Sequence, residues 1–409
     1  MEEWKEYKIG DVCKIKRGAS PRPIQQFISN KGMPWVKIAD ATATDSMFLD
    51  STKEYIKEEG ISKSVTVMPG TLIVSNSATP GLPKVIRIKA CVHDGWLIIS
   101  DFKGVHRDFM YYKFVDIRRY LSNQANGSVF QNLKTDIVRE FSIKIPSLKT
   151  QEEIVSILKS LDDKIEVNRK INENLEQQAQ ALFKSWFVDF EPFKNGEFVE
   201  SELGMIPKGW RVCRADEVFD INIGKTPPRK EPEWFTKNTS DNIWVSIADM
   251  GSCGMFVSES SEYLTNEAIN RFNILMVDEG SVLLSFKLTV GRVAIADTRL
   301  TTNEAIARFQ LPQSYYREFL YLYLKQYKYG NLGSTSSIAT AVNSKTIKGM
   351  KLITPPEDVI SCFSKHTKPL FDKIKVLSQE SRRLAELRDT LLPKLMSGEL
   401  KVNEIEDVL

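Results

Sequence analysis

The chain has 409 residues, 42% of them hydrophobic and 27% charged, a composition that excludes a mostly disordered protein and a length that predicts at least two folded units. Lys and Arg number 56 against 53 Asp and Glu, so any binding to nucleic acid must come from local basic patches and not from overall charge. Five scattered cysteines, a charged N-terminus and the lack of a long apolar run favour a reduced, cytoplasmic protein without a membrane span.

Residues 1–149 alternate short β-rich runs with turns rich in Gly, Pro and Asn. Thr71–Ser75, Lys84–Lys89 and Trp96–Ser100 are expected strands, and Arg107–Leu121 is an expected helix. This pattern predicts a mixed α/β globule, so the fold class is α/β in the broad, α+β sense.

Residues 150–190 have a different character, because Gln, Glu, Lys and Leu dominate and neither Pro nor Gly interrupts them before Phe190. Thr150 and Glu153 form an expected capping box at the start. Apolar residues then recur in alternating steps of four and three from Ile154 to Trp186, which predicts a long helix with a coiled-coil seam. A helix of about 40 residues is about 60 Å long.

The second half of the chain repeats the first. Trp35–Asp40 (WVKIAD) returns as Trp244–Asp249 (WVSIAD), 209 residues later, and further matches follow in the same order. We therefore expect a second globule over 191–356 and a second long helix within 357–409, with the same heptad phase. Pro369 should kink that helix or delay its start. If the helices run antiparallel, a pseudo-twofold axis relates the repeats, as a local dyad relates the halves of duplex DNA.

Two segments at the helix ends, ALFKSWFVDFEP (181–192) and LRDTLLPKLMSGEL (387–400), resemble the signature of Type I restriction-modification specificity subunits. The openings Trp4–Gly18 and Trp210–Gly224 and the run Gly127–Lys134 are also similar to that family. The resemblance covers essentially the whole chain. It implies two target recognition domains (1–149 and 191–356), a central conserved region (150–190) and a distal conserved region (357–409).

The resemblance also implies a function and partners. Each domain would read one half of an asymmetric, bipartite double-stranded DNA target. The helices would space the domains and dock two methyltransferase subunits, and restriction subunits would join that core. The chain itself would be non-catalytic, and S-adenosylmethionine would belong to the methyltransferase. The alternative is a coiled-coil interaction scaffold that does not bind DNA.

The residues themselves favour binding over bond-making. The sequence contains no Asn-Pro-Pro-aromatic motif and no Gly-rich cofactor loop. The Gly224-Lys225-Thr226 run has Phe219 where a phosphate-binding loop requires its first Gly. The three histidines have no neighbouring His or Cys at ligand spacing, so we expect no metal site.

Contacts to DNA should then come from turn-rich loops that carry Lys, Arg, Ser, Thr, Asn or Gln, which suit phosphates and base edges. In the first globule the candidates are Lys16, Arg17, Ser20, Arg22, Ser75, Asn76, Ser77, Lys84, Ser128, Gln131, Asn132 and Lys134. In the second they are Lys225, Thr226, Arg229, Lys230, Ser285, Lys287, Arg292, Ser334, Thr335, Ser336 and Ser337. The alternative for any single candidate is a solvated surface side chain. Trp35 and Trp244 are expected in the core.

The helix ends carry more large apolar side chains than a two-helix seam can bury. We expect them to dock onto a partner, the alternative being that each group packs on its neighbouring globule. The candidates are Leu182, Phe183, Trp186, Phe187, Val188, Phe190, Leu391, Leu392, Leu395 and Met396.

Overall fold

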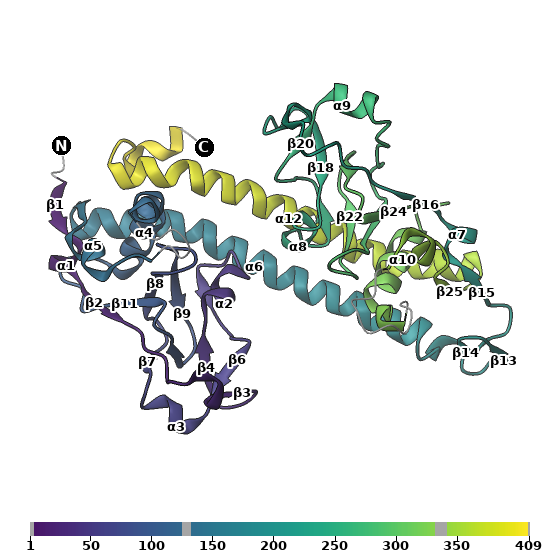
Figure 1. The fold of residues 1–409 in the computed structure, drawn as a ribbon, viewed down its shortest axis with the longest axis horizontal. Helices are drawn as coiled ribbons and strands as arrows, with labels where there is room; N and C mark the ends of the chain where they lie inside the picture. Colours follow the sequence, from purple (N-terminus) through teal and green to yellow (C-terminus); the bar gives the residue numbers. More distant parts are fainter. Residues whose placement is uncertain (1–3, 125–131, 332–341, 408–409) are drawn as a thin grey trace. The chain divides into compact units, whose positions relative to one another are not determined.

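A computed structural model describes residues 4–124, 132–331 and 342–407 (Figure 1). The chain divides into two compact units, the first made of Met1–Val167 with Ser381–Leu409 and the second of Asn168–Glu380. Each unit therefore combines one globule with part of two long helices.

Two sheets pack face to face in the first unit. One has the strand order β2 (Lys14–Arg17), β11 (Trp96–Ser100), β8 (Leu72–Ser75), β9 (Pro83–Ile86) and β5 (Phe48–Leu49). The other runs β3 (Ile28–Ser29), β6 (Glu54–Ile56), β4 (Met33–Val36), β10 (Ala90–Val92) and β7 (Val65–Val67). A ribbon of β1 (Lys5–Lys8) and β12 (Ser142–Ile145) and the helices α1 (Ile9–Val12), α2 (Ile38–Thr42), α3 (Glu58–Ile61), α4 (Arg107–Asn123) and α5 (Thr135–Glu140) complete this globule.

The second unit repeats this plan. Its larger sheet runs β16 (Asp220–Ile223), β24 (Ile306–Gln310), β21 (Val282–Ser285), β22 (Val293–Ala296) and β19 (Phe256–Val257). Its smaller sheet runs β17 (Phe235–Thr236), β20 (Tyr263–Leu264), β18 (Asn242–Val245) and β23 (Thr301–Thr302). Around them lie the pairs β13 (Phe198–Ser201) with β14 (Gly204–Pro207) and β15 (Arg211–Arg214) with β25 (Lys351–Thr354), and the helices α7 (Ala215–Val218), α8 (Asp249–Ser252), α9 (Asn266–Arg271), α10 (Tyr316–Gln326) and α11 (Ser344–Lys348).

The two larger sheets share one topology. In each, the edge pair β5–β9 or β19–β22 is parallel and the other neighbours are antiparallel. The central strands are buried on both faces, because side chains alternate between two cores. In β8, Leu72 and Val74 face α4, whereas Ile73 faces the smaller sheet. The internal repeat and the mixed α/β fold predicted from the sequence are confirmed, as is the burial of Trp35 and Trp244.

The long helices are α6 (Leu148–Phe187) and α12 (Glu357–Ser397). In the first unit, Arg388 Nη1 of α12 donates to Asp162 Oδ1 of α6 at 2.7 Å. In the second, the rings of Phe183 and Phe363 lie 6.2 Å apart. Since the late part of one helix meets the early part of the other in both units, the helices are antiparallel. Every position of the predicted seam is buried or half-buried.

The starts of both helices correct two expectations. α6 begins before Thr150, with Ser147 Oγ accepting a 3.4 Å hydrogen bond from the Thr150 backbone, so Ser147 caps it. α12 begins at Glu357 and continues through Pro369, so its start is not delayed. The buried residues Phe363 and Phe371 hold the helix to the core on either side of Pro369, which offsets the lost backbone hydrogen bond.

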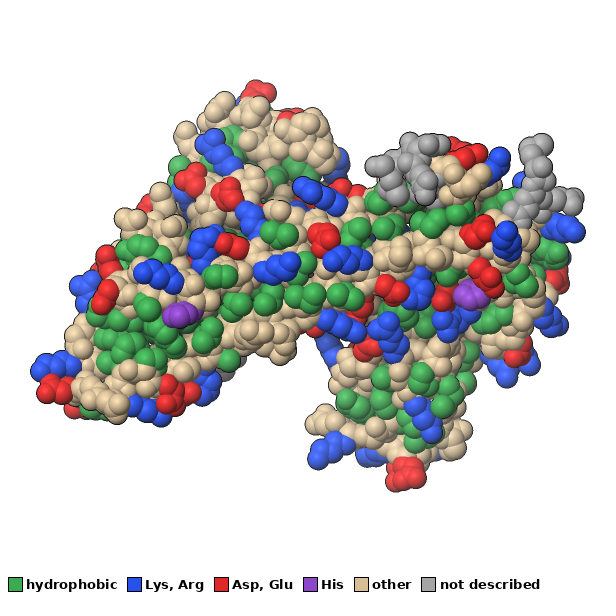
Figure 2. Space-filling model, turned by 180° about the vertical axis from the view of Figure 1, so that it is seen from behind, with side chains coloured by type: hydrophobic (Ala, Val, Ile, Leu, Met, Phe, Trp, Pro, Cys, Tyr) green, Lys and Arg blue, Asp and Glu red, His purple; other side chains and the backbone are tan. Residues whose placement is uncertain are grey.

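Charges of both signs are interspersed on the face of the molecule that Figure 2 shows. None of the helices in the described ranges combines the length and apolar character that a membrane span requires. Any binding site therefore depends on the local arrangement of side chains and not on net charge.

Candidate nucleic-acid interface

Candidate side chains from separate loops of the first unit meet at Asp94, in the turn between β10 and β11. Ser20 Oγ donates to Asp94 Oδ1 at 2.5 Å, and Arg22 Nη2 donates to Oδ2 at 3.1 Å. Arg17 Nε donates to the Asp94 carbonyl oxygen at 2.7 Å, and Asn76 Nδ2 lies 3.3 Å from the same oxygen. The fold thus brings together residues from two predicted loops.

Asp94 is ionised at neutral pH. Partial burial opposes ionisation, but the hydrogen bonds from Ser20 and the backbone, together with the Arg22 charge, lower the pKa of Asp94 below its ordinary value. Its side chain keeps 41% exposure, so a carboxylate stands among basic groups at the surface. A carboxylate in this setting can accept a hydrogen bond from the amino group of cytosine.

The second unit builds a matching pair. Thr226 Oγ1 donates to a carboxylate oxygen of Glu304, which follows β23 as Asp94 follows β10. Close packing of the loops requires glycine in both units, since a Cβ on Gly18 or Gly224 would lie 2.2 Å from a carbonyl oxygen of the neighbouring strand end. Both repeats therefore hold a hydroxyl–carboxylate pair close to a tightly packed glycine that follows the first strand of the larger sheet.

The sequence did not single out Asp94 and Glu304, because only basic, hydroxyl and amide side chains were expected to contact DNA. A signal was present, because both repeats place an acidic residue two positions before a strand of the larger sheet, Asp94 before β11 and Glu304 before β24. Acceptors are part of the base-reading chemistry of proteins as well as donors.

The remaining basic candidates differ between the units. Arg229 contacts Glu262 at 2.8 Å and lies over the Trp244 ring, and the Lys225 amine donates to two backbone carbonyls. Arg292 is half-buried and donates to the Ile247 carbonyl at 2.5 Å, so it is turned inward. Besides Arg17, Arg22, Lys225 and Arg229, the exposed candidates are Lys16, Asn132, Lys134, Lys230 and Lys287, whereas Ser77 is half-buried. Ser128, Gln131, Ser334, Thr335, Ser336 and Ser337 lie outside the described residues.

Four of the described candidates are buried; one of them, Asn76, donates to the Asp94 carbonyl from inside the fold, and the other three have structural roles, which corrects the expectation that they reach DNA. The Lys84 side chain is enclosed, and its amine donates to the carbonyls of Thr44 at 2.7 Å and Ser46 at 2.5 Å. Burial lowers the pKa of Lys84 to about 8. The buried hydroxyls of Ser75 and Ser285 close their own loops by hydrogen bonds to backbone groups.

The apolar helix ends also need correction. Phe183, Phe187, Leu391, Leu392, Leu395 and Met396 are buried in the cores of their own units. Phe187 packs at 4.8 Å from the Phe363 ring and 5.0 Å from the Phe319 ring. Leu182, Trp186 and Phe190 are half-buried against the same core, and Val188 is 49% exposed. The alternative that these groups pack on the neighbouring globule holds for most of them, because side chains such as Phe183 and Phe187 contact α10 of the globule as well as the other long helix.

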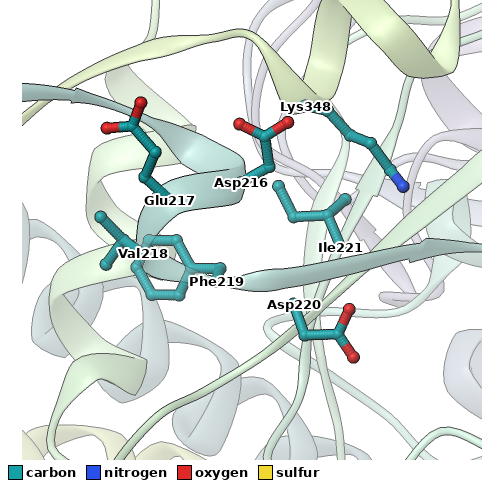
Figure 3. Close-up of a pocket in the computed structure, with 7 residues that line it drawn as sticks. All are labelled: Asp216, Glu217, Val218, Phe219, Asp220, Ile221 and Lys348. Carbon is teal, nitrogen blue, oxygen red and sulfur yellow. The ribbon is translucent and has the colours of Figure 1, made fainter.

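A shallow pocket on the second unit lies apart from these candidates. Figure 3 shows that Asp216, Glu217 and Asp220 surround it together with the Lys348 amine. Three carboxylates against one amine would repel a phosphate, so this pocket does not extend the candidate interface. Within the described ranges, no three His, Cys, Asp or Glu side chains gather as a metal-binding group.

The repeated units match a known family along most of the chain. The family model described as the Type I restriction modification DNA specificity domain matches residues 1–177 and 207–361. The chain belongs to this family. Its two globules are therefore the target recognition domains of a type I specificity protein.

Other type I specificity proteins align with the chain over nearly its whole length. The Type I restriction enzyme MjaIX specificity subunit of Methanocaldococcus jannaschii is 29% identical, with 99% of this chain and 95% of that protein aligned. The HindI specificity subunit of Haemophilus influenzae is 26% identical, with 98% and 100% aligned. The crystal structure of the S subunit from M. genitalium, at 14% identity, covers 96% of each chain with a TM-score of 0.55 and shows the same fold.

Proposed function

We propose that each target recognition domain reads one half of an interrupted DNA target, through the loops around its hydroxyl–carboxylate pair. The observation that carries this proposal is the recurrence of that pair, Ser20–Asp94 and Thr226–Glu304, at equivalent places in two domains of one topology. Flanking Lys and Arg side chains supply phosphate contacts, which set register, while the oriented polar groups supply base contacts.

The proposed target is asymmetric, because the two sites share a framework and differ in detail. Arg22 contacts the acid of the first pair, whereas Arg229 contacts Glu262 and lies over an aromatic ring. The first acid is Asp and the second is Glu, so the carboxylates reach different distances. Two unlike reading sites on one polypeptide select two unlike half-sites.

The paired helices set the distance between the half-sites in this proposal. Asn168 Nδ2 lies 2.8 Å from Glu380 Oε2, and Asn172 Nδ2 lies 3.2 Å from Ser378 Oγ. Polar contacts of this kind inside an apolar seam fix the register of helices. A fixed register keeps the length of the spacer constant.

The chain assembles, in this proposal, with two methyltransferase subunits and with restriction subunits, and supplies no bond-making group itself. Partners dock on exposed parts of the long helices and on the segment that directly follows α6, where Val188 exposes an apolar side chain. The methyltransferase carries S-adenosylmethionine and flips an adenine out of each half-site.

A selection experiment tests this function. The chain, co-purified with its methyltransferase, is incubated with a pool of random-sequence duplexes, and the bound DNA is sequenced over several rounds. We expect two short, unlike sequence blocks separated by a gap of fixed length. Enrichment of no sequence, with an intact complex, would leave the interaction scaffold as the better description.

A further inference from the structure

A fully exposed leucine stands at the tip of the loop between β21 and β22. Leu288 is 98% exposed, the highest value among the exposed large apolar residues of the described chain. Its φ of 58° lies in the left-handed region, which branched L side chains avoid. An apolar side chain held in water on an unfavourable backbone calls for a role outside the fold.

The rest of the loop fixes this leucine in place. Ser285 Oγ donates to the Thr289 carbonyl at 2.6 Å and accepts from the Arg292 backbone at 3.0 Å. The Phe286 ring is buried, and its backbone N–H donates to the Ala305 carbonyl at 2.9 Å. The hydrogen bonds of Ser285 and the buried Phe286 ring therefore fix the conformation of the loop, and Leu288 points outward from its tip.

The first domain builds the same loop with a different tip. Ser75 closes it through the same two backbone contacts, to the Thr79 carbonyl and from the Leu82 N–H. Ala78 occupies the tip with a φ of 59°. The strained backbone thus belongs to the shared framework, whereas the side chain that it presents changes from a methyl group to an isobutyl group. A loop whose backbone is the same in both domains and whose exposed side chain differs is suited to selecting different partners.

The surroundings of Leu288 indicate DNA as that partner. The hydrogen bond from Phe286 joins this loop to Ala305, the residue after Glu304, so the tip belongs to the same loop cluster as the Thr226–Glu304 pair. The exposed Lys287 directly precedes the leucine. Duplex DNA offers phosphates to the lysine, and it offers thymine methyl groups and separable base steps to an apolar tip.

We propose that Leu288 makes an apolar contact with a base pair in the half-site read by the second domain. The inference rests on the proposed function, since it needs the second domain to face DNA. It names a specificity-determining side chain that is not a hydrogen-bond donor or acceptor. Ala78, with its smaller side chain, leaves the corresponding position of the first domain without an equal contact.

The substitution Leu288→Asn tests the contact without disturbing the loop, because Asn tolerates the left-handed conformation and lacks the apolar surface. Leu203→Asn is the matched control, since Leu203 is 45% exposed in the turn of the β13–β14 hairpin of the same unit. Affinity is measured by fluorescence anisotropy with the methyltransferase complex, on the selected target and on a target whose second block is scrambled.

Leu288→Asn should weaken binding to the intact target about tenfold and leave binding to the scrambled target unchanged. Leu203→Asn should change neither. Equal affinity of wild type and Leu288→Asn for the intact target overturns the inference. So does loss of the methyltransferase from the Leu288→Asn complex, which would make Leu288 a protein contact. If the wild-type complex does not distinguish the two duplexes, the proposed function itself fails.

Two further duplexes identify the apolar surface that is touched. Replacing thymines of the second block by deoxyuridine removes the methyl groups, and loss of the wild-type advantage there indicates methyl contact. A rise in 2-aminopurine fluorescence on binding, seen with wild type and absent with Leu288→Asn, indicates insertion at a base step instead. Either result supports a base contact. If neither change is seen and wild type and Leu288→Asn bind equally, the base contact is contradicted.

Discussion

Ser20 Oγ donates a 2.5 Å hydrogen bond to Asp94 Oδ1 across 74 positions of the sequence. Thr226 and Glu304 form the same contact across 78 positions in the second repeat. The hydroxyl in each pair comes from the loop after the first strand of the larger sheet, and the acid comes from the turn before its neighbouring strand. The pair therefore orients a surface carboxylate and does not build the core.

Replacing Asp94 with Asn should change base preference in the first half-site only. The amide keeps the size of the side chain but replaces a charged acceptor with a group that also donates, which favours a different base edge. We expect about a tenfold loss on the wild-type target and an altered first block when the selection is repeated. Because the side chain is 41% exposed, the free energy of unfolding should change by less than about 1 kcal/mol.

Asp136→Asn is the control for this prediction, since Asp136 is an 84% exposed acid of the same domain whose side chain pairs with the nearby Arg139. It should leave both blocks of the target unaltered. An Asp94→Asn complex that selects the wild-type first block would show that the carboxylate does not read a base.

Lys84 predicts a pH dependence of stability. Burial lowers the pKa of its amine from 10.5 to about 8 in the folded chain. Between these values the unfolded chain holds a proton that the folded chain has released, so the free energy of unfolding rises with pH through this window. The total rise in the free energy of unfolding is at most about 3 kcal/mol. This gain is lost again as the pH falls toward 8, because the folded state must then carry a buried charge.

Urea unfolding of wild type and Lys84→Met, compared at pH 7.5 and at pH 10, isolates this group from others that titrate nearby. The wild-type free energy of unfolding should increase relative to that of the variant as the pH is raised. Lys84→Met should also bind the selected DNA as wild type does, since the amine faces two carbonyls inside the domain. A parallel pH dependence in the two proteins contradicts the lowered pKa.

Neighbouring residues at the end of α6 separate packing from docking. Phe187→Ser should lower the free energy of unfolding by about 3–5 kcal/mol, because the ring is buried among aromatic neighbours. Val188→Ser, at a half-exposed position, should cost under about 1 kcal/mol. Thermal unfolding checks both. If Val188 lies in the methyltransferase contact, Val188→Ser weakens co-purification at unchanged stability, and undiminished co-purification places the contact elsewhere.

Periodicity and repetition predicted the architecture because both are properties of residue order. The seam from Ile154 to Trp186 and the 209-residue repeat could be read directly, since helical spacing and domain duplication leave a pattern in one dimension. A helix start delayed by Pro369 was a wrong alternative, because the local cost of the proline is offset by tertiary packing of Phe363 and Phe371, which the local sequence does not show.

The binding site was only partly predictable, because residue type does not give side-chain direction. Lys84 and Lys16 have the same chemistry. The side chain of Lys84 is nevertheless buried, because its strand is covered on both faces, whereas that of Lys16 faces solvent. Asp94 was missed because an acid was not expected at a DNA-binding surface. Leu288 carries no polar atom on its side chain, and only its exposure and its φ angle mark it.

Inserting seven residues into both long helices tests whether they set the spacing of the target. The insertions are made where Asn172 of α6 meets Ser378 of α12, so that the two helices lengthen at one level. Seven residues are close to two helical turns, which preserves the seam, and they add about 10.5 Å, or about three base pairs of DNA. Selection should return the same two blocks with a gap about three base pairs longer. About three base pairs also turn one half-site by roughly a third of a helical turn, so affinity should fall.

An insertion of 21 residues, close to one turn of DNA, should recover part of that affinity at a gap about nine base pairs longer. Lengthening α6 alone breaks the register and should abolish selection. An unchanged gap after paired insertion contradicts the role of the helices as a spacer.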